Sequence, residues 1–304
     1  MKFTIAIPTY NNEFTISETI ISCLEQDYVG DYEIIISNNN STDRTEEIIK
    51  SFASNNPNIR IIKSNKCESM WKNHNICLSE SSGEYVLFCH ADDTLEPQAL
   101  TIIDEKLIER KSPKKYVLWG HSLFNDYKKI LDKYNWRVGD YIVGEEAYKI
   151  FVGGGLAPSG VCYSRKSFLE MGGFIDDKNY VFPNSDSSTM MKLAFAGFGF
   201  EMIENMYLKR TGSSSAFLNI KTKYEVLEDV NHMKILLSDN FSNLQLSQIA
   251  YESIKTNYAY AFYISRLENQ FKKTVIKDTI KQLLKSPKDV FNRKKRYYLK
   301  KIIF

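Results

Sequence analysis

Short apolar runs alternate with helical stretches through the first third of the chain. Ile, Val and Phe, which favour buried strands, dominate the runs at 3–7, 32–37, 59–63 and 85–89. The stretches between these runs have the length and pattern of helices, at 14–26, 43–55 and 69–80. This alternation predicts an α/β fold with a mostly parallel sheet and helices on both faces. Ligands bind such sheets at the carboxyl ends of the strands.

The pattern changes from about residue 216. Apolar positions such as Ile264, Leu267, Phe271 and Val275 recur there at intervals of three and four. This spacing is typical of amphipathic helices. We therefore expect one α/β domain at 1–215, followed by a helical region at 216–304.

Composition places the chain among ordinary globular proteins. Of 304 residues, 43% are apolar and 25% are charged, which excludes a disordered or fibrous chain. The five cysteines are an odd number without CxxC spacing, which favours a reducing compartment over a disulfide framework. The amino terminus does not resemble a secretory signal, and no run of 18 apolar residues occurs. A cytoplasmic protein is expected.

Charge is distributed unevenly along the chain. Residues 272–304 contain twelve Lys or Arg against two Asp, a net charge of 12 − 2 = +10, whereas residues 1–271 carry 28 − 35 = −7. An acidic body is unlike a nucleic-acid binder, whose cationic face belongs to its folded core. The basic tail, interleaved with apolar side chains, is either a solvated helix face or a segment that binds an anionic membrane surface.

Polar loops follow three of the expected strands, at 8–12, 37–41 and 90–93. None contains the GxGxxG or GxxxxGK[ST] pattern, so a dinucleotide fold or a P-loop kinase is poorly supported. The four histidines lack the i, i+4 spacing of a zinc site, which argues against a His-based metal cage.

Two acidic positions are candidates for chemistry. Asp92 and Asp93 follow an apolar strand, where they would bind Mg²⁺ or Mn²⁺ together with a diphosphate, or else cap a helix that starts near Pro97. Asp186 falls in the first turn of an apolar-faced helix, where it would act as a general base or as a simple N-terminal cap.

A series of short motifs runs in one order along the first two thirds of the chain. They are Ile5-Ala6-Ile7-Pro8-Thr9-Tyr10-Asn11, Ser37-Asn38-Asn39-Asn40-Ser41-Thr42-Asp43, Asn75 before Gly83-Glu84-Tyr85, Ala91-Asp92-Asp93, Pro158-Ser159-Gly160, Gly172-Gly173-Phe174, and Asp186 before Lys192-Leu193-Ala194. In this order they resemble the GT-A fold (Rossmann-like) glycosyltransferases of family 2, an inverting family that builds bacterial polysaccharides. The resemblance covers residues 3 to about 215 and implies a nucleotide-sugar half at about 1–95 and an acceptor half at about 96–215.

The resemblance also implies roles for individual residues. The nucleotide sugar would be bound by Pro8, Thr9, Tyr10, Asn11, Asn38, Asn39, Lys72, Asn75, Ala91, Asp92 and Arg210. Asp92 and Asp93 would hold Mn²⁺ or Mg²⁺ at the diphosphate. Asp186 would deprotonate the acceptor hydroxyl for in-line attack at the anomeric carbon.

Four positions depart from the family pattern: Asn38, His90, Ser185 and Gly212. Asn38 stands where most members have an Asp that accepts the uracil N–H, which leaves the identity of the base open. His90 replaces the first Asp of the metal motif. Ser185 stands in place of a Glu, and Gly212 in place of a metal-proximal His.

The implied function is transfer of a sugar, preferably from a UDP-sugar, to a polysaccharide or lipid-linked oligosaccharide of a bacterial surface glycan such as capsule or lipopolysaccharide. Because many relatives use lipid-linked acceptors at the cytoplasmic leaflet, the resemblance favours peripheral membrane attachment through 272–304. Two alternatives remain open. A non-catalytic relative would bind nucleotide sugar without turnover. A sugar nucleotidyltransferase is less favoured, because the loop at 8–13 has neither Gly nor Lys.

Overall fold

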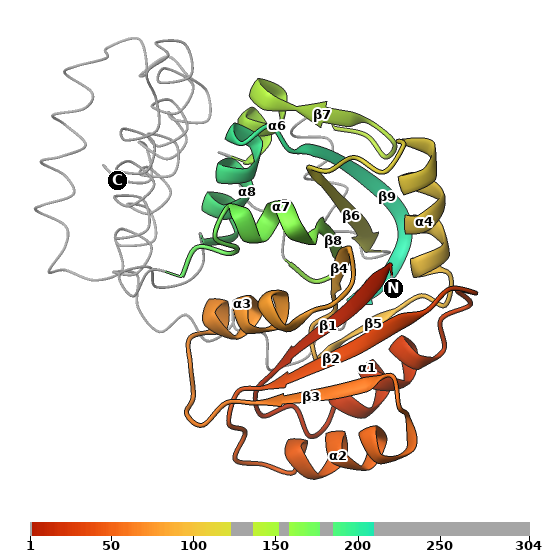
Figure 1. The fold of residues 1–304 in the computed structure, drawn as a ribbon, viewed down its shortest axis with the longest axis vertical. Coiled ribbons are helices and arrows are strands. Elements are labelled where there is room, and N and C mark those ends of the chain that lie inside the picture. Colours follow the sequence, from red (N-terminus) through yellow and green to blue (C-terminus); the bar gives the residue numbers. More distant parts are fainter. Residues whose placement is uncertain (1, 123–135, 152–157, 177–184, 210–304) are drawn as a thin grey trace, which may run out of the picture.

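The computed structural model describes residues 2–122, 136–151, 158–176 and 185–209, drawn in colour in Figure 1. The first seven elements are β1 (Phe3–Thr9), α1 (Ile16–Leu24), β2 (Tyr32–Asn38), α2 (Thr45–Asn55), β3 (Ile59–Lys63), α3 (Met70–Glu80) and β4 (Tyr85–Phe88). Their order and type confirm the pattern expected for this part of the chain. The expected helical region at 216–304 lies outside the described residues.

The elements that follow alternate less regularly between strand and helix. They are β5 (Asp93–Leu95), α4 (Ala99–Glu109), β6 (Tyr116–Ser122), β7 (Tyr141–Val143), α6 (Gly144–Phe151), β8 (Val161–Ser164), α7 (Arg165–Glu170), α8 (Ser185–Phe195) and β9 (Gly199–Lys209). Within the described ranges, no helix is both long and apolar enough to cross a membrane.

The strands form one sheet in the order β3-β2-β1-β4-β8-β6-β9-β5, with β7 paired to β9. Strands β3, β2, β1 and β4 pair in parallel with one another in that order. Strand β8 is antiparallel to both β4 and β6, so the second half of the sheet is mixed. The α/β class is confirmed, and the parallel half carries the polar loops predicted to bind ligand.

Alternate residues of the central strands face two separate cores. Ile5 and Ile7 of β1 pack in the core beneath α1, α2 and α4. Ala6 of β1 and Phe88 of β4 belong to the core beneath α3, α6, α7 and α8. Figure 1 shows α1 and α2 on one side of the sheet and α3, α7 and α8 on the other. Helices therefore cover both faces, as the alternation predicted.

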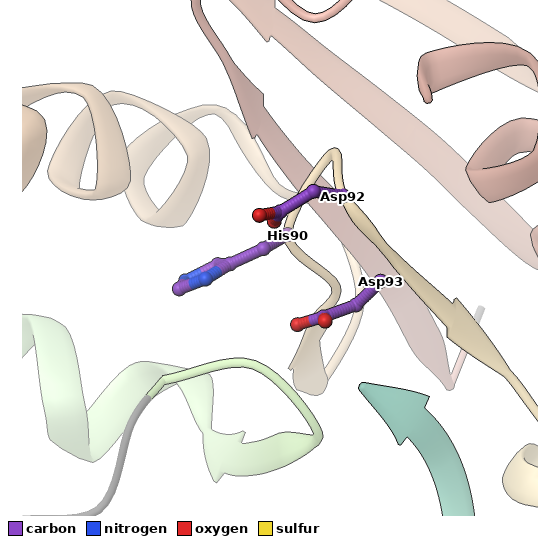
Figure 2. Close-up of side chains that lie close together, drawn as sticks. All are labelled: His90, Asp92 and Asp93. Atoms are coloured by element: carbon purple, nitrogen blue, oxygen red, sulfur yellow. The ribbon is translucent and has the colours of Figure 1, made fainter. Parts of the chain in front are cut away.

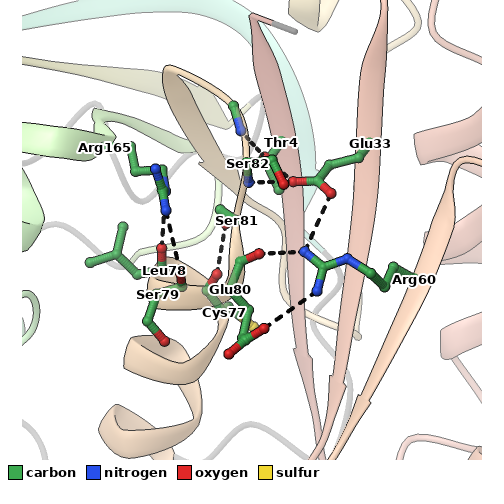
Figure 3. A network of polar contacts seen from close by, with 11 residues as sticks. Thr4, Glu33, Arg60, Cys77, Leu78, Ser79, Glu80, Ser81, Ser82 and Arg165 are labelled. Atoms are coloured by element: carbon green, nitrogen blue, oxygen red, sulfur yellow. Dashed lines mark hydrogen bonds and ion pairs between the residues drawn. The ribbon is translucent and has the colours of Figure 1, made fainter.

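A polar network ties the carboxyl end of α3 to the amino ends of the first strands (Figure 3). Glu33 accepts hydrogen bonds from the Thr4 hydroxyl at 2.7 Å and the Ser82 N–H at 2.6 Å, and pairs with Arg60 at 3.4 Å. Gly83 passes so close to β1 that a Cβ there would lie 2.6 Å from the Thr4 nitrogen. The amino ends of these strands, opposite the predicted ligand site, are thus held together by polar contacts.

The second half of the sheet contains a buried ion pair. Glu201 of β9 is fully buried and accepts hydrogen bonds from Arg110 Nε at 2.9 Å and Nη2 at 3.2 Å. The Tyr116 hydroxyl donates to the same carboxylate. Burial opposes the charged form of Glu201, but the bonds from Arg110 and Tyr116 outweigh it and lower the pKa of this carboxyl.

Replacing Glu201 with Gln is expected to lower the free energy of unfolding by about 3 kcal/mol, because Arg110 keeps its charge without a buried counter-ion. Urea unfolding at pH 7 measures the loss. The matched control is Glu109→Gln on the neighbouring helix, whose partly exposed pair with Lys106 contributes about 1 kcal/mol or less.

The same pair predicts a pH dependence. The folded pKa of Glu201 lies below the ordinary 4.5, so its stabilising contribution is complete above that value and declines as the pH falls through the folded pKa. The loss of stability on acidification should therefore be shallower in Glu201→Gln than in the wild type. Equal acid slopes would contradict this assignment.

Candidate active site

The loops after β1 and β2 are joined by backbone and side-chain hydrogen bonds. The Asn11 N–H donates to the Ser41 hydroxyl at 3.0 Å, and Asn11 Oδ1 accepts the Thr42 N–H at 2.8 Å. One residue further, the Asn12 N–H donates to the Thr45 hydroxyl at 2.8 Å. Asn11 has a φ of 54°, in the left-handed region that Asn tolerates better than most residues. Loops thirty residues apart in sequence thus form one surface.

The residues predicted at the first loop lie at different depths. Pro8 and Thr9 are buried, and the Thr9 hydroxyl donates to Asn12 Oδ1 at 2.9 Å. The same oxygen accepts the Tyr10 N–H at 3.0 Å. The Tyr10 side chain is 47% exposed, which leaves its ring available for stacking on a ligand.

The two asparagines at the end of β2 differ in how their amides are used. Asn39 is buried and makes two hydrogen bonds with the Glu68 backbone, at 2.8 and 2.9 Å. Asn38 is fully buried, and its Oδ1 accepts the Ser41 N–H at 3.1 Å. Its Nδ2 has no partner among the described residues. A buried donor without an acceptor costs about 1–3 kcal/mol.

Three side chains of the loop after β4 lie close together (Figure 2). One potential ligand atom from each of His90, Asp92 and Asp93 falls within 4.8 Å of the others. Two carboxylates and an imidazole form a donor set suited to a divalent cation, so the residues present fit the predicted metal. The alternative role for the acidic pair is wrong, because α4 begins at Ala99 with Gln98 as its N-cap residue and without a side-chain cap.

Helix α1 holds this acidic loop in place through two hydroxyls one helical turn apart. Thr15 Oγ1 donates to the carbonyl of Ala91 at 2.7 Å, and Thr19 Oγ1 donates to the carbonyl of Asp93 at 2.8 Å. Ala91 and Asp93 are both buried. Thr15 is the N-cap residue of α1 and Thr19 lies within the helix, and nothing in the sequence indicates that either contacts the acidic loop.

A second histidine reaches the site from α3. His74 Nε2 lies 3.0 Å from His90 Nε2, and His74 Nδ1 lies 2.8 Å from the carbonyl of Met70. Burial, followed by the nearby His90, lowers the pKa of His74 to about 3. The backbone N–H of His90 donates to the Ser159 hydroxyl at 3.0 Å. Sequence spacing did not reveal this pair, because sixteen residues separate its members and only tertiary packing joins them.

Two further predicted residues lie on α3. Asn75 makes two hydrogen bonds, both of 2.8 Å, with the backbone N–H and carbonyl of Phe174. Gly173 has a φ of +66°, and a Cβ there would lie 2.3 Å from Asn75 Oδ1. Asn75 thus connects α3 to the segment after α7, while its contact with a nucleotide stays a prediction. Lys72 is exposed in the first turn of α3.

Asp186 lies in the first turn of α8, as predicted. The helix buries Met190, Met191 and Leu193 against the sheet. Burial, followed by the charge of Asp186, raises the pKa of Tyr163 on the adjacent β8. Asp186 is therefore close enough to the sheet to act electrostatically on β8. Arg210 and Gly212, and the side chain of Ser185, lie outside the described residues.

Comparison with known sequences finds similarity to glycosyltransferases over part of the chain. Residues 4–137 match the family model for glycosyl transferase family 2. A segment of 102 residues is 31% identical to the poly(ribitol-phosphate) beta-N-acetylglucosaminyltransferase TarS of Staphylococcus aureus and covers 33% of this chain but 18% of TarS. A segment of 109 residues is 31% identical to the GalNAc(5)-diNAcBac-PP-undecaprenol beta-1,3-glucosyltransferase of Campylobacter jejuni, covering 36% of this chain and 35% of that enzyme.

Solved structures support the same fold over more of the chain. Residues 1–349 of S. aureus TarS, in complex with UDP-GlcNAc, superpose with a TM-score of 0.66 at 19% identity, covering 90% of this chain and 75% of that one. A mannosyltransferase from Pyrobaculum calidifontis, in complex with GDP-Man and Mn²⁺, has a TM-score of 0.64 at 18% identity and covers 99% and 86% of the two chains. At these identities the likeness establishes the fold alone.

Proposed function

We propose that this chain, whose residues 4–137 match glycosyl transferase family 2, transfers a sugar from a nucleotide diphosphate sugar to a hydroxyl of a bacterial surface polysaccharide or lipid-linked oligosaccharide. One observation carries the proposal: the loops after β1, β2 and β4 meet at one edge of the sheet, and the third of them brings His90, Asp92 and Asp93 together. A nucleotide and its diphosphate need both features, a shaped polar surface and a nearby cation site.

A UDP-sugar is the favoured donor. The TarS structure that this fold resembles was solved with UDP-GlcNAc, which supports a uridine nucleotide. The neighbour solved with GDP-Man and Mn²⁺ supports a nucleotide sugar together with a divalent cation. In our proposal the exposed ring of Tyr10 stacks on the nucleotide, and the polar loop after Asn38 lies beside the base.

The proposed reaction inverts the anomeric carbon in one step. The acceptor hydroxyl gives its proton to the Asp186 carboxylate while its oxygen forms a bond to the anomeric carbon. The bond from that carbon to the diphosphate breaks, and its electron pair leaves with the nucleoside diphosphate. When bound by Asp92 and Asp93, Mn²⁺ or Mg²⁺ would supply positive charge to the departing diphosphate. Positioning of both substrates contributes the remainder of the rate.

Binding of the donor nucleotide should depend on Asp92. Titrating UDP, GDP, dTDP and CDP by calorimetry, with and without Mn²⁺, should show metal-dependent binding of one nucleotide, with UDP favoured. Asp92→Ala should weaken it about 10-fold or more, because a ligand of the cation is lost. Asp31→Ala is the control, because this exposed acid directly precedes β2, at the end of the strand away from the candidate site. Binding of the same strength without metal, or in Asp92→Ala, would contradict the donor site.

Asp186→Asn separates catalysis from binding. Loss of the general base should lower the rate of sugar transfer about 10²- to 10⁴-fold, whereas donor affinity should stay within twofold of the wild type. Product formation from radiolabelled donor and a bacterial lipid-linked glycan fraction measures the rate. Asp31→Asn should transfer normally. If the wild type binds donor but neither transfers nor hydrolyses it, the protein is a binding module instead.

We also propose peripheral attachment at the cytoplasmic membrane through residues 272–304. Their net charge of +10, interleaved with apolar side chains, would be attracted to anionic lipid by about 1 kcal/mol for each basic residue near the surface. Deletion of 272–304 should release the protein from vesicles that contain anionic lipid in a flotation assay. Equal flotation of the full and shortened chains would contradict this attachment.

A further inference from the structure

The contact between His74 and His90 determines which ring nitrogens carry protons. A carbonyl oxygen only accepts hydrogen bonds, so the 2.8 Å contact with Met70 requires a proton on His74 Nδ1. His74 is 2% exposed, and no carboxylate of the described residues is bonded to it, so its ring is neutral. A neutral ring with a proton on Nδ1 leaves Nε2 as an acceptor.

The tautomer of His74 sets the tautomer of His90. Two unprotonated nitrogens do not form a hydrogen bond, so the 3.0 Å contact requires His90 Nε2 to donate its proton to His74 Nε2. A neutral His90 then has its lone pair on Nδ1. Nδ1 is bonded to Cγ and is therefore the ring nitrogen nearer to the main chain of His90. His90 belongs to the group that includes Asp92 and Asp93 (Figure 2).

The aromatic side chains packed around His74 hold its ring in one orientation. The His74 ring stacks on Phe88 at 5.4 Å between centroids and meets Phe174 edge-on at 5.4 Å. Trp71 lies 5.4 Å away in the same core. On the other side of the contact, the Ser159 hydroxyl accepts the backbone N–H of His90. The His74 ring cannot turn without disrupting these buried neighbours, so its Nε2 is a fixed acceptor that orients the His90 ring before any ligand binds.

We propose that His90 is a third ligand of the divalent cation through Nδ1, with His74 as the residue that positions it, and that this nitrogen ligand makes the site prefer Mn²⁺ over Mg²⁺. An imidazole nitrogen is a softer ligand than a carboxylate oxygen, which favours transition-metal ions over Mg²⁺. The inference rests on the cation site of the proposed function but needs no sugar transfer. The spacing of the histidines argued only against a cage made of several histidines, and a single His90 beside two carboxylates is consistent with it.

The test uses Mn²⁺ alone with the full chain, and pulsed EPR to detect ¹⁴N coupled to the bound ion. The wild type should show ¹⁴N coupling, and His90→Asp should bind Mn²⁺ without it. Competition with Mg²⁺ should show a lower preference for Mn²⁺ in His90→Asp, whose ligands are all oxygens. Wild-type Mn²⁺ bound without ¹⁴N coupling, or the absence of bound Mn²⁺, would overturn the proposal. Sugar transfer in EDTA is measured separately, so the proposed function stands or fails by its own result.

Two substitutions of His74 test its positioning role. His74→Phe keeps an aromatic ring in the core but removes the acceptor, and should weaken Mn²⁺ binding about 10- to 100-fold. His74→Gln is the matched control, because its amide oxygen can still accept from His90 Nε2 and should restore most of the affinity. Thermal unfolding without metal identifies any variant that fails to fold. Equal Mn²⁺ affinities for folded His74→Phe and wild type, or equal losses in both variants, would overturn the role of His74.

Discussion

Strand β4 is the element on which the rest of the structure depends. It pairs in parallel with β1 on one side and antiparallel with β8 on the other, so it joins the two halves of the sheet. Its end is fixed from both sides, because the Cys89 N–H donates to Ala6 and the Gly160 N–H donates to the Phe88 carbonyl. The chain leaves β4 directly into the loop of Asp92 and Asp93. A shift of this strand would therefore move the acidic group relative to the loops that form the nucleotide surface.

Helix α3 packs on the same strand and makes polar contacts at both ends of the strands. At its carboxyl end, the network around Glu33 and Arg60 anchors it to the amino ends of β1 and β2 (Figure 3). At its amino end, His74 meets His90 at the ligand edge. Asn75 joins the same helix to Phe174. The helix thus links the structural end of the domain to the candidate site, which explains why it buries several polar side chains.

Local sequence pattern was sufficient for the parallel half of the fold and for the polar loops that follow its strands. Strands β1 to β4 are rich in Ile, Val and Phe, and Asp186 precedes an apolar helix face, so the hydrophobic pattern identified both. The antiparallel pairing of β8 could not be predicted from the sequence, because a strand of four residues carries no signal for its direction. The contact of His74 with His90 and the hydrogen bonds of Asn75 with Phe174 could not be predicted for a related reason. Each joins segments that only tertiary packing brings together.

The central claim is that a nucleotide binds where the loops after β1, β2 and β4 meet. Hydrogen–deuterium exchange of the full chain, with and without UDP and Mn²⁺, tests this claim most directly, because it locates the protected backbone. The account predicts slower exchange in peptides that cover 8–13, 37–43 and 89–95, with the amino-terminal edge at 81–84 unchanged. Unchanged exchange in all three loops, or protection confined to other segments, would contradict it.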